Sequence, residues 1–203
     1  MRDDRKHIFA AIVARDLHAV RLELDSEPCL EERDESGRTP LMRASLLGFD
    51  EIVEEILKHG PHLDAADEDG DNALILSATL DRVAIARKLI ANGSAIDDSN
   101  RMTGETSLMA AAYSASAECV RALLALGANP NAQNKYGITP LMRATFSNNV
   151  DSVRALLEHH AAIDVADEQG RTALSHAVTK GHTEIAELLR EKGANPDLKP
   201  RPH

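Results

Sequence analysis

One short pattern recurs through this 203-residue sequence at almost constant spacing, and it constrains the fold more than any other feature. Its fullest copy is Gly137-Ile138-Thr139-Pro140-Leu141-Met142-Arg143-Ala144, and the stretch from Gly37 to Ala44 is nearly identical. Three more altered copies begin at Gly70, Gly104 and Gly170, so that successive glycines are 33, 34, 33 and 33 residues apart. A chain with this period stacks one structural unit repeatedly, and each unit packs only against its neighbours.

Each residue of the pattern has a local structural role. Thr139 can cap a helix by accepting hydrogen bonds from its free backbone N–H groups, and Pro140 suits the first helical position, where no N–H is needed. Gly137 allows a turn with positive φ just before the cap. The pattern therefore predicts a turn followed by a helix.

A period of about 33 residues with a T-P-L-x-x-A signature resembles the ankyrin repeat family. The resemblance extends from about Lys6 to Pro196. It implies an all-α fold, a solenoid of stacked helix-turn-helix units joined by hairpin-like finger loops, with about six repeats including the caps.

The register predicts that residues 1–203 form a single ankyrin-repeat domain. Its first unit lacks the Thr-Pro entry and its last lies at the end of the array, so we expect these two to be capping repeats. The predicted units are 1–36 (N-terminal cap), 37–69, 70–103, 104–136, 137–169 and 170–198 (C-terminal cap), followed by a proline-rich tail at 199–203.

Two details follow from comparing the second helices of the repeats. Four of them are predicted to end at a left-handed glycine, at Gly60, Gly93, Gly127 and Gly193, whereas the fifth repeat has His160 there and should have a strained or different helix end. At the position of Ile56 the first repeat has Glu23, and at the position of Leu57 the last repeat has Arg190. We therefore expect Ile56 to face the preceding repeat and Leu57 the following one.

The formal net charge of −10 produces a field that repels nucleic acid and anionic lipid, so neither is expected as a partner. The charged N-terminal residues precede only a short apolar run, which predicts neither a signal peptide nor a membrane span. We expect a cytoplasmic protein that is monomeric when free.

Catalytic and metal-binding patterns are weak. His59 and His62 have no third ligand at zinc-like spacing, and the acidic run Asp64 to Asp71 lacks the glutamate that a calcium loop requires at its twelfth position. The sequence has no phosphate-binding loop, nucleophile elbow or H-E-x-x-H motif. We therefore predict a protein that is not an enzyme and that carries no cofactor or metal.

The resemblance implies that a partner protein binds in the concave groove formed by the fingers and the first helices. By register, Tyr113 and Phe146 occupy variable positions near the end of a first helix, and Arg43 and Arg143 lie earlier on the same kind of helix. Exposed aromatic residues give large contact area at low entropic cost. The predicted partner-binding residues are Tyr113, Phe146, Arg143, Tyr136, Met102, Arg43, Leu46, Leu47 and Leu80.

Two alternatives remain open for these residues. The aromatic side chains would be structural if they fill gaps between repeats, and the arginines would be structural if they only pair with nearby carboxylates.

The finger charges favour the centre of the array as the main contact. Asp34-Glu35, Asp67-Glu68-Asp69 and Asp167-Glu168 make the outer fingers acidic, whereas the middle fingers carry Asn100-Arg101-Met102 and Asn134-Lys135-Tyr136. A less acidic, partly apolar centre is a plausible docking patch. We therefore expect repeats four and five to make the main contact.

The sequence predicts a non-enzymatic scaffold that binds a partner protein as an adaptor or inhibitor. The alternatives are a regulator or accessory subunit of an enzyme, and a small-molecule-binding protein.

Overall fold

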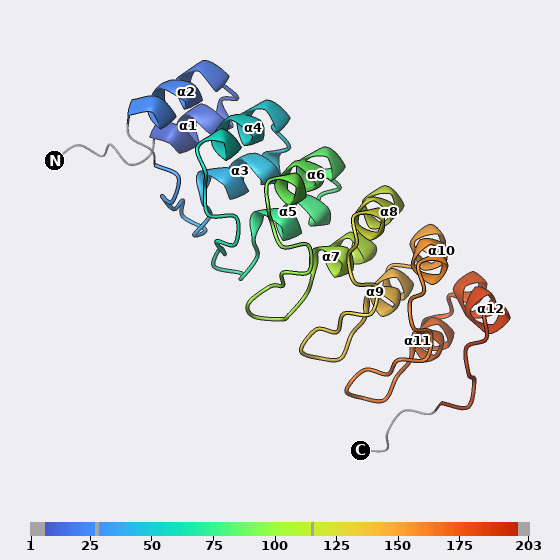
Figure 1. The fold of residues 1–203 in the computed structure, drawn as a ribbon. Helices are drawn as coiled ribbons and strands as arrows, with labels where there is room; N and C mark the ends of the chain where they lie inside the picture. Colours follow the sequence, from blue (N-terminus) through green and yellow to red (C-terminus); the bar gives the residue numbers. More distant parts are fainter. Residues whose placement is uncertain (1–6, 27–28, 115, 199–203) are drawn as a thin grey trace. The chain divides into compact units, whose positions relative to one another are not determined.

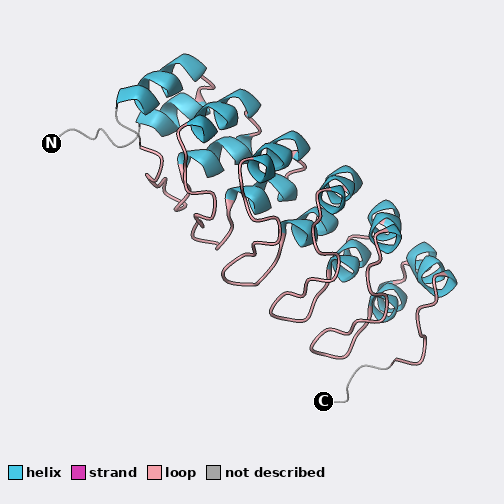
Figure 2. Cartoon of the chain, in the orientation of Figure 1, coloured by secondary structure: helices cyan, strands magenta, loops and turns pink. Residues whose placement is uncertain are grey.

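The computed structural model describes residues 7–26, 29–114 and 116–198. The predicted tail at 199–203 lies outside these residues, as do parts of the N-terminal cap, residues 1–6 and 27–28. The described residues form twelve short helices joined by loops, without a β-strand (Figures 1 and 2). The helices are α1 (His7–Val13), α2 (Leu17–Ser26), α3 (Pro40–Leu47), α4 (Asp50–Lys58), α5 (Ala73–Thr79), α6 (Val83–Ala91), α7 (Ser107–Tyr113), α8 (Ala117–Ala125), α9 (Pro140–Phe146), α10 (Val150–Glu158), α11 (Ala173–Lys180) and α12 (Thr183–Glu191).

The chain divides into two compact units, unit 1 (Met1–Met102) and unit 2 (Thr103–His203). In unit 1 the odd-numbered helices pack side by side as one layer, α1 on α3 and α3 on α5, while α2, α4 and α6 form a second layer. Unit 2 repeats this arrangement, with α7, α9 and α11 in the first layer and α8, α10 and α12 in the second. Long finger loops connect each second helix to the next first helix (Figure 1).

Side-chain caps start the first helices as the sequence pattern predicts. The Thr139 hydroxyl accepts a hydrogen bond from the Met142 amide at 3.3 Å, and Pro140 is the first residue of α9. Asn72, which stands where other repeats have threonine, caps α5 in the same way by accepting from the Ile75 amide at 2.9 Å. The most altered copy of the pattern has therefore kept its capping function.

The second helices end in the left-handed conformation at the predicted positions. Gly60, Gly93, Gly127 and Gly193 have φ values of 69°, 103°, 96° and 92°. His160 has a φ of 62°, so the helix end of the fifth repeat has the same shape as the others. The prediction of strain is supported, because an L-residue with a Cβ pays for this conformation.

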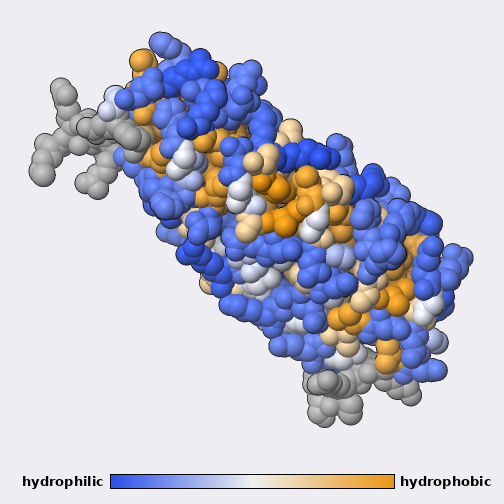
Figure 3. Space-filling view, in the orientation of Figure 1, coloured by the Kyte–Doolittle hydropathy of each residue, from blue (hydrophilic) through white to orange (hydrophobic). Residues whose placement is uncertain are grey.

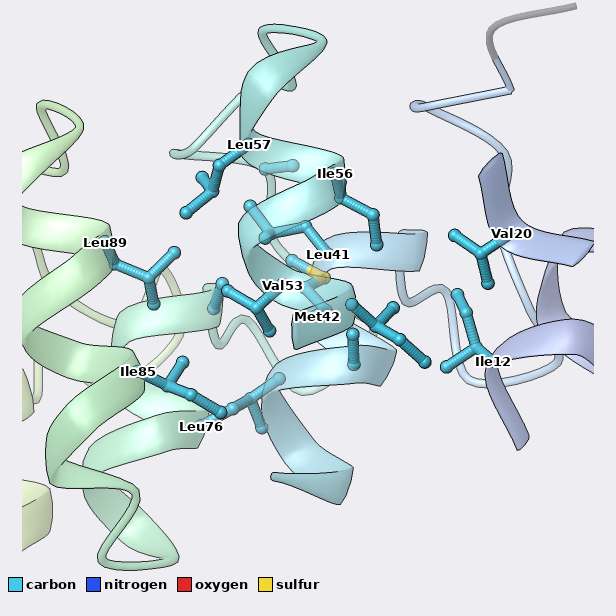
Figure 4. Close-up of a cluster of buried hydrophobic side chains, with 14 of the residues drawn as sticks. Ile12, Val20, Leu41, Met42, Val53, Ile56, Leu57, Leu76, Ile85 and Leu89 are labelled. Atoms are coloured by element: carbon cyan, nitrogen blue, oxygen red, sulfur yellow. The ribbon is translucent and has the colours of Figure 1, made fainter. Parts of the chain in front are cut away.

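The core of unit 1 consists of apolar side chains placed between neighbouring helix pairs (Figure 4). Ile56 is fully buried on the side of α4 that faces Val20, whereas Leu57 lies on the side that faces Leu89 (Figure 4). The predicted directions of these two positions are confirmed. At the ends of the array, Glu23 is half-buried and Arg190 is exposed.

Hydrophilic residues dominate the molecular face seen in Figure 3, and hydrophobic residues appear on it in separate patches. None of the described helices has the length and apolar character needed to cross a lipid bilayer.

Candidate protein-binding site

Tyr113, Arg143 and Phe146 lie together on the first-helix layer of unit 2. The Arg143 guanidinium carbon is 5.3 Å from the centre of the Tyr113 ring and 5.9 Å from the centre of the Phe146 ring. Both distances are in the range of cation–π attraction. The arrangement links α7 to α9, because Tyr113 ends one helix and the other two residues belong to the next.

Arg143 is also paired with a carboxylate. It forms an ion pair with Glu105, at the start of the same repeat as Tyr113, and its Nε is buried without a hydrogen-bond partner. Burial lowers the pKa of Arg143 below its usual value, although an arginine stays charged in any case. In unit 1 the equivalent Arg43 lies 3.6 Å from the Asp34 carboxylate. Pairing with nearby carboxylates, the structural alternative for the two arginines, is therefore observed at both positions.

Phe146 continues the row toward α11. Its ring meets the His176 ring edge-on, with centroids 4.4 Å apart and an interplanar angle of 84°. His176 is buried, and its Nε2 lies 3.1 Å from Asp167 Oδ2, which also accepts a bond from Arg171 Nε at 2.9 Å. These contacts form a continuous row, Tyr113–Arg143–Phe146–His176, which we call the unit 2 ridge.

Burial and hydrogen bonding set the charges of the His176–Asp167 pair. Burial lowers the pKa of His176 and outweighs the opposing effect of its bond to Asp167. Burial alone would raise the pKa of Asp167, but hydrogen bonds from Arg171 and His176 bring it below its usual value. An ionised Asp167 can only accept, so His176 Nε2 must carry the hydrogen.

Exposure separates the two aromatic residues that the sequence places at equivalent positions. Tyr113 is 57% exposed, whereas Phe146 is half-buried against His176. Phe146 thus partly fills the space between α9 and α11, as the structural alternative for the aromatic residues expects, and Tyr113 does not. Tyr136, on a finger of unit 2, is 56% exposed.

The remaining predicted contact residues belong to unit 1. Arg43, Leu46 and Leu47 of α3 are half-buried, while Leu80, just after α5, and Met102, at the end of the unit, are exposed. The main contact predicted from the sequence therefore draws Met102 from unit 1 and its other four residues from unit 2.

Some of the finger carboxylates are paired. Asp34, Asp67, Asn100, Asn134 and Asp167 are equivalent turn residues, and in each finger the side-chain oxygen accepts a backbone N–H of the finger tip. Each aspartate also has a cationic partner, since Arg43, Arg38 and Arg171 lie beside Asp34, Asp67 and Asp167 respectively. The acidic character of the outer fingers therefore rests on the other carboxylates, such as Glu35, Glu68, Asp69 and Glu168.

A charge rule explains why the middle fingers carry asparagine. In three repeats the residue after the opening glycine reaches the turn residue of the following finger. Arg38 Nε donates to Asp67 Oδ2 at 3.1 Å, Asn100 Nδ2 donates to Asp71 Oδ1 at 2.5 Å, and Asn134 Nδ2 donates to Glu105 Oε1 at 3.2 Å. Asp67 therefore follows a cation and the two asparagines follow carboxylates, whereas Asp167 follows Ile138 and pairs with Arg171 of its own finger. The asparagines have a structural reason, which weakens the charge argument for a central docking patch.

Sequence reasoning missed His176, Asp167 and Glu105 as members of this site. The 33-residue register contained the signal, because it places His176 at the position of Arg43 and Arg143, and Glu105 at the position of Arg38. Within the part of the chain that the structure describes, no cluster of three or more His, Cys, Asp or Glu side chains is arranged to hold a metal ion.

Comparison with known proteins defines the class. The family description "Ankyrin repeat" matches residues 36–68, and "Ankyrin repeats (3 copies)" matches residues 62–134 and 108–200. The chain belongs to the ankyrin repeat family.

Solved structures agree with this assignment. An ankyrin repeat domain from Acinetobacter baumannii is 30% identical, with a TM-score of 0.85 over 95% of this chain and 100% of that one. The ankyrin repeat domain of Bcl-3, a member of the IkappaB protein family, is 25% identical, with a TM-score of 0.87 over 98% of this chain and 91% of that one. No curated protein sequence gives a significant match. Ankyrin repeat domains are generally protein–protein interaction modules, and they are typically not enzymes.

Proposed function

We propose that this chain is a non-enzymatic scaffold that binds a partner protein through Tyr113, Arg143 and Phe146 of the unit 2 ridge and Tyr136 of the adjoining finger. The observation that carries the proposal is the stacking of a half-exposed tyrosine on a half-buried arginine. Tyrosine and arginine are enriched among the residues that dominate binding energy. Tyr113 and Tyr136 expose their rings to solvent, and the Arg143 charge is held beside the Tyr113 ring.

Pre-organisation supports the same surface. Arg143 lies within cation–π distance of two rings and is paired with Glu105, so few of its rotamers remain to be lost when a partner binds. Ordering a long side chain costs roughly 0.5–1.5 kcal/mol, and that cost has already been met here. In this proposal the protein acts as an adaptor or inhibitor by occupying a surface of its partner.

The proposal has a second, wider part. Arg43, Leu46, Leu47, Leu80 and Met102 of unit 1 would add contacts to a long partner. We further propose that the protein acts in the cytoplasm, is monomeric when free, and binds neither nucleic acid nor membranes.

Photo-crosslinking tests the proposal. A benzophenone amino acid placed at Tyr113 or Tyr136 should capture one protein from cytosol, whereas the same group at Arg121, exposed on α8, should not. The Tyr113→Ala/Tyr136→Ala variant should bind the captured protein at least about tenfold more weakly than the Arg121→Ala variant. Equal binding by the two variants would contradict the assignment of the surface.

Arg143 offers a finer test. Arg143→Lys keeps the charge and loses the planar group that stacks on the two rings, so partner affinity should still fall. A chain that captures no protein from Tyr113 or Tyr136, but purifies with a bound small molecule, would favour the small-molecule alternative.

A further inference from the structure

The acidity of the protein is concentrated in unit 1. Residues 1–102 contain 13 Lys and Arg against 22 Asp and Glu, a net charge of −9, whereas residues 103–203 contain 10 against 11, a net charge of −1. The two units therefore present different fields to a charged partner.

A surface cavity of about 560 Å³ lies on unit 1 between α1 and the first finger. Phe9, Ala10 and Val13 form its apolar wall, and Arg43 with the finger residues Asp34 and Ser36 lies opposite. Val13 is 56% exposed, although valine is a residue that proteins usually bury. The cavity is large enough for one or two apolar side chains.

The acidic tip of the second finger adjoins this cavity. The Glu68 amide donates to the Ser36 carbonyl at 3.2 Å, which places the Glu68–Asp69 tip beside a residue of the cavity lining. Both carboxylate residues are exposed, and so is Asp64 at the base of the same finger. A cation on a partner could reach these side chains while an apolar neighbour enters the cavity.

The arginines of this surface are already engaged. Arg38 pairs with Asp67 and lies 4.0 Å from the Asp69 carboxylate, Arg43 pairs with Asp34, and Arg33 donates to the carbonyls of Gly37 and Ala66. Burial is the main cause that raises the pKa of Asp71, and the negative potential of the Asp67 and Asp69 carboxylates adds to it against the bond from Asn100. An approaching Lys or Arg would relieve that potential.

We propose that this surface of unit 1 binds a basic segment of a partner protein, with an apolar side chain in the cavity beside Val13 and cationic side chains at Asp64, Glu68 and Asp69. The surface lies on unit 1 and shares Arg43 with the residues proposed above for a long partner, and it differs from the unit 2 ridge in taking a basic segment. Charge complementarity selects the occupant, since a neutral apolar segment would leave the finger carboxylates unused and an acidic one would be repelled.

Selection from a random peptide display library, with the whole chain as bait, tests the proposal. Enriched peptides should have a net positive charge and at least one large apolar residue, and their affinity should fall with added salt. The Asp64→Asn/Glu68→Gln/Asp69→Asn variant should bind the best peptide roughly tenfold more weakly, and Val13→Ser should also weaken it. All four side chains are exposed, so these changes should leave the melting temperature nearly unchanged.

The control removes three charges elsewhere. The control variant is Glu158→Gln/Glu187→Gln/Glu191→Gln, whose exposed positions are on α10 and α12 of unit 2. Its affinity for the peptide should stay within about twofold of that of the unchanged protein, because distant exposed charges are screened. Enrichment of neutral or acidic peptides, or equal weakening by the control, would overturn the proposal. Weaker binding of the basic peptide by the Tyr113→Ala/Tyr136→Ala variant would also overturn it, because those residues belong to the unit 2 ridge. The crosslinking test of the ridge can fail without affecting this proposal.

Discussion

Asn134 donates a hydrogen bond from Nδ2 to Glu105 Oε1 across 3.2 Å, and this bond connects two successive fingers of unit 2. Asn134 is buried and the Glu105 side chain is only 19% exposed, so an unfavourable charge here would be poorly screened. Asn134→Asp sets one carboxylate against another. It should lower the free energy of unfolding by about 1–3 kcal/mol.

A double-mutant cycle isolates the repulsion in urea unfolding. Asn134→Asp should cost clearly less in a Glu105→Gln background, because the amide can donate to the new carboxylate. The same cost in both backgrounds would show that the turn alone, and not the pair, requires asparagine.

Thr139 supplies the only side-chain cap that the structure shows at the start of α9, through its bond to the Met142 amide. Thr139→Ala should lower the free energy of unfolding by about 1 kcal/mol, and Thr139→Ser should retain most of it. Circular dichroism melts of the three proteins provide the measurement. Equal melting of the Ala and Ser variants would mean that the hydroxyl contributes nothing.

His160 and Gly127 occupy equivalent positions with a left-handed backbone, and substitutions at the two positions should change the stability in opposite directions. His160→Gly should stabilise the protein by roughly 0.5–1 kcal/mol, because glycine adopts positive φ without a Cβ penalty. Gly127→Ala should destabilise it by about 1 kcal/mol through the backbone alone, since a Cβ there would meet no atom within 4 Å. Chemical unfolding of both variants should give opposite signs, and a shared sign would refute the strain assigned to His160.

The His176–Asp167 pair predicts a loss of stability with acid. The unfolded chain takes up a proton at His176 near pH 6.5, but the folded chain resists it because burial lowers the pKa of His176. Neutral His176 thus makes its full contribution to the free energy of unfolding above pH 6.5. That contribution is lost as the pH falls through the lower pKa of His176 in the folded protein. The contribution of Asp167 follows at lower pH, since its folded pKa lies below 3.8.

His176→Gln should flatten the dependence of unfolding free energy on pH as the pH falls below about 6.5. His62→Gln, at an exposed position, serves as the matched control. An unchanged slope in His176→Gln would assign the dependence to other groups.

The repeated pattern determined the fold in detail because its residues act locally. A threonine before a proline caps a helix whatever surrounds it, and a left-handed helix end depends on a single backbone angle. The altered copy that begins at Gly70 also starts a helix at the position that the register gives.

The candidate site was less predictable because it depends on pairs that belong to different repeats. Tyr113 and Arg143 were identified one at a time, but their stacking is a property of two helices. Asp67 was placed among the acidic finger residues, because its partner Arg38 belongs to the preceding repeat and a single finger does not show the pair. Comparing each repeat with the next one in register reveals the charge rule between Arg38 and Asp67 and between Glu105 and Asn134.

Backbone bonds between finger tips give the loops an unexpected property. In unit 1 the amides of Glu68 and Arg101 donate to Ser36 and Gly70, and in unit 2 those of Lys135 and Glu168 donate to Thr103 and Tyr136. These amides lie in exposed residues and yet should exchange slowly with deuterium. Each unit has two such amides. A partner that binds the fingers would change the exchange rates of the amides that it covers, so these rates identify the fingers in contact with the partner.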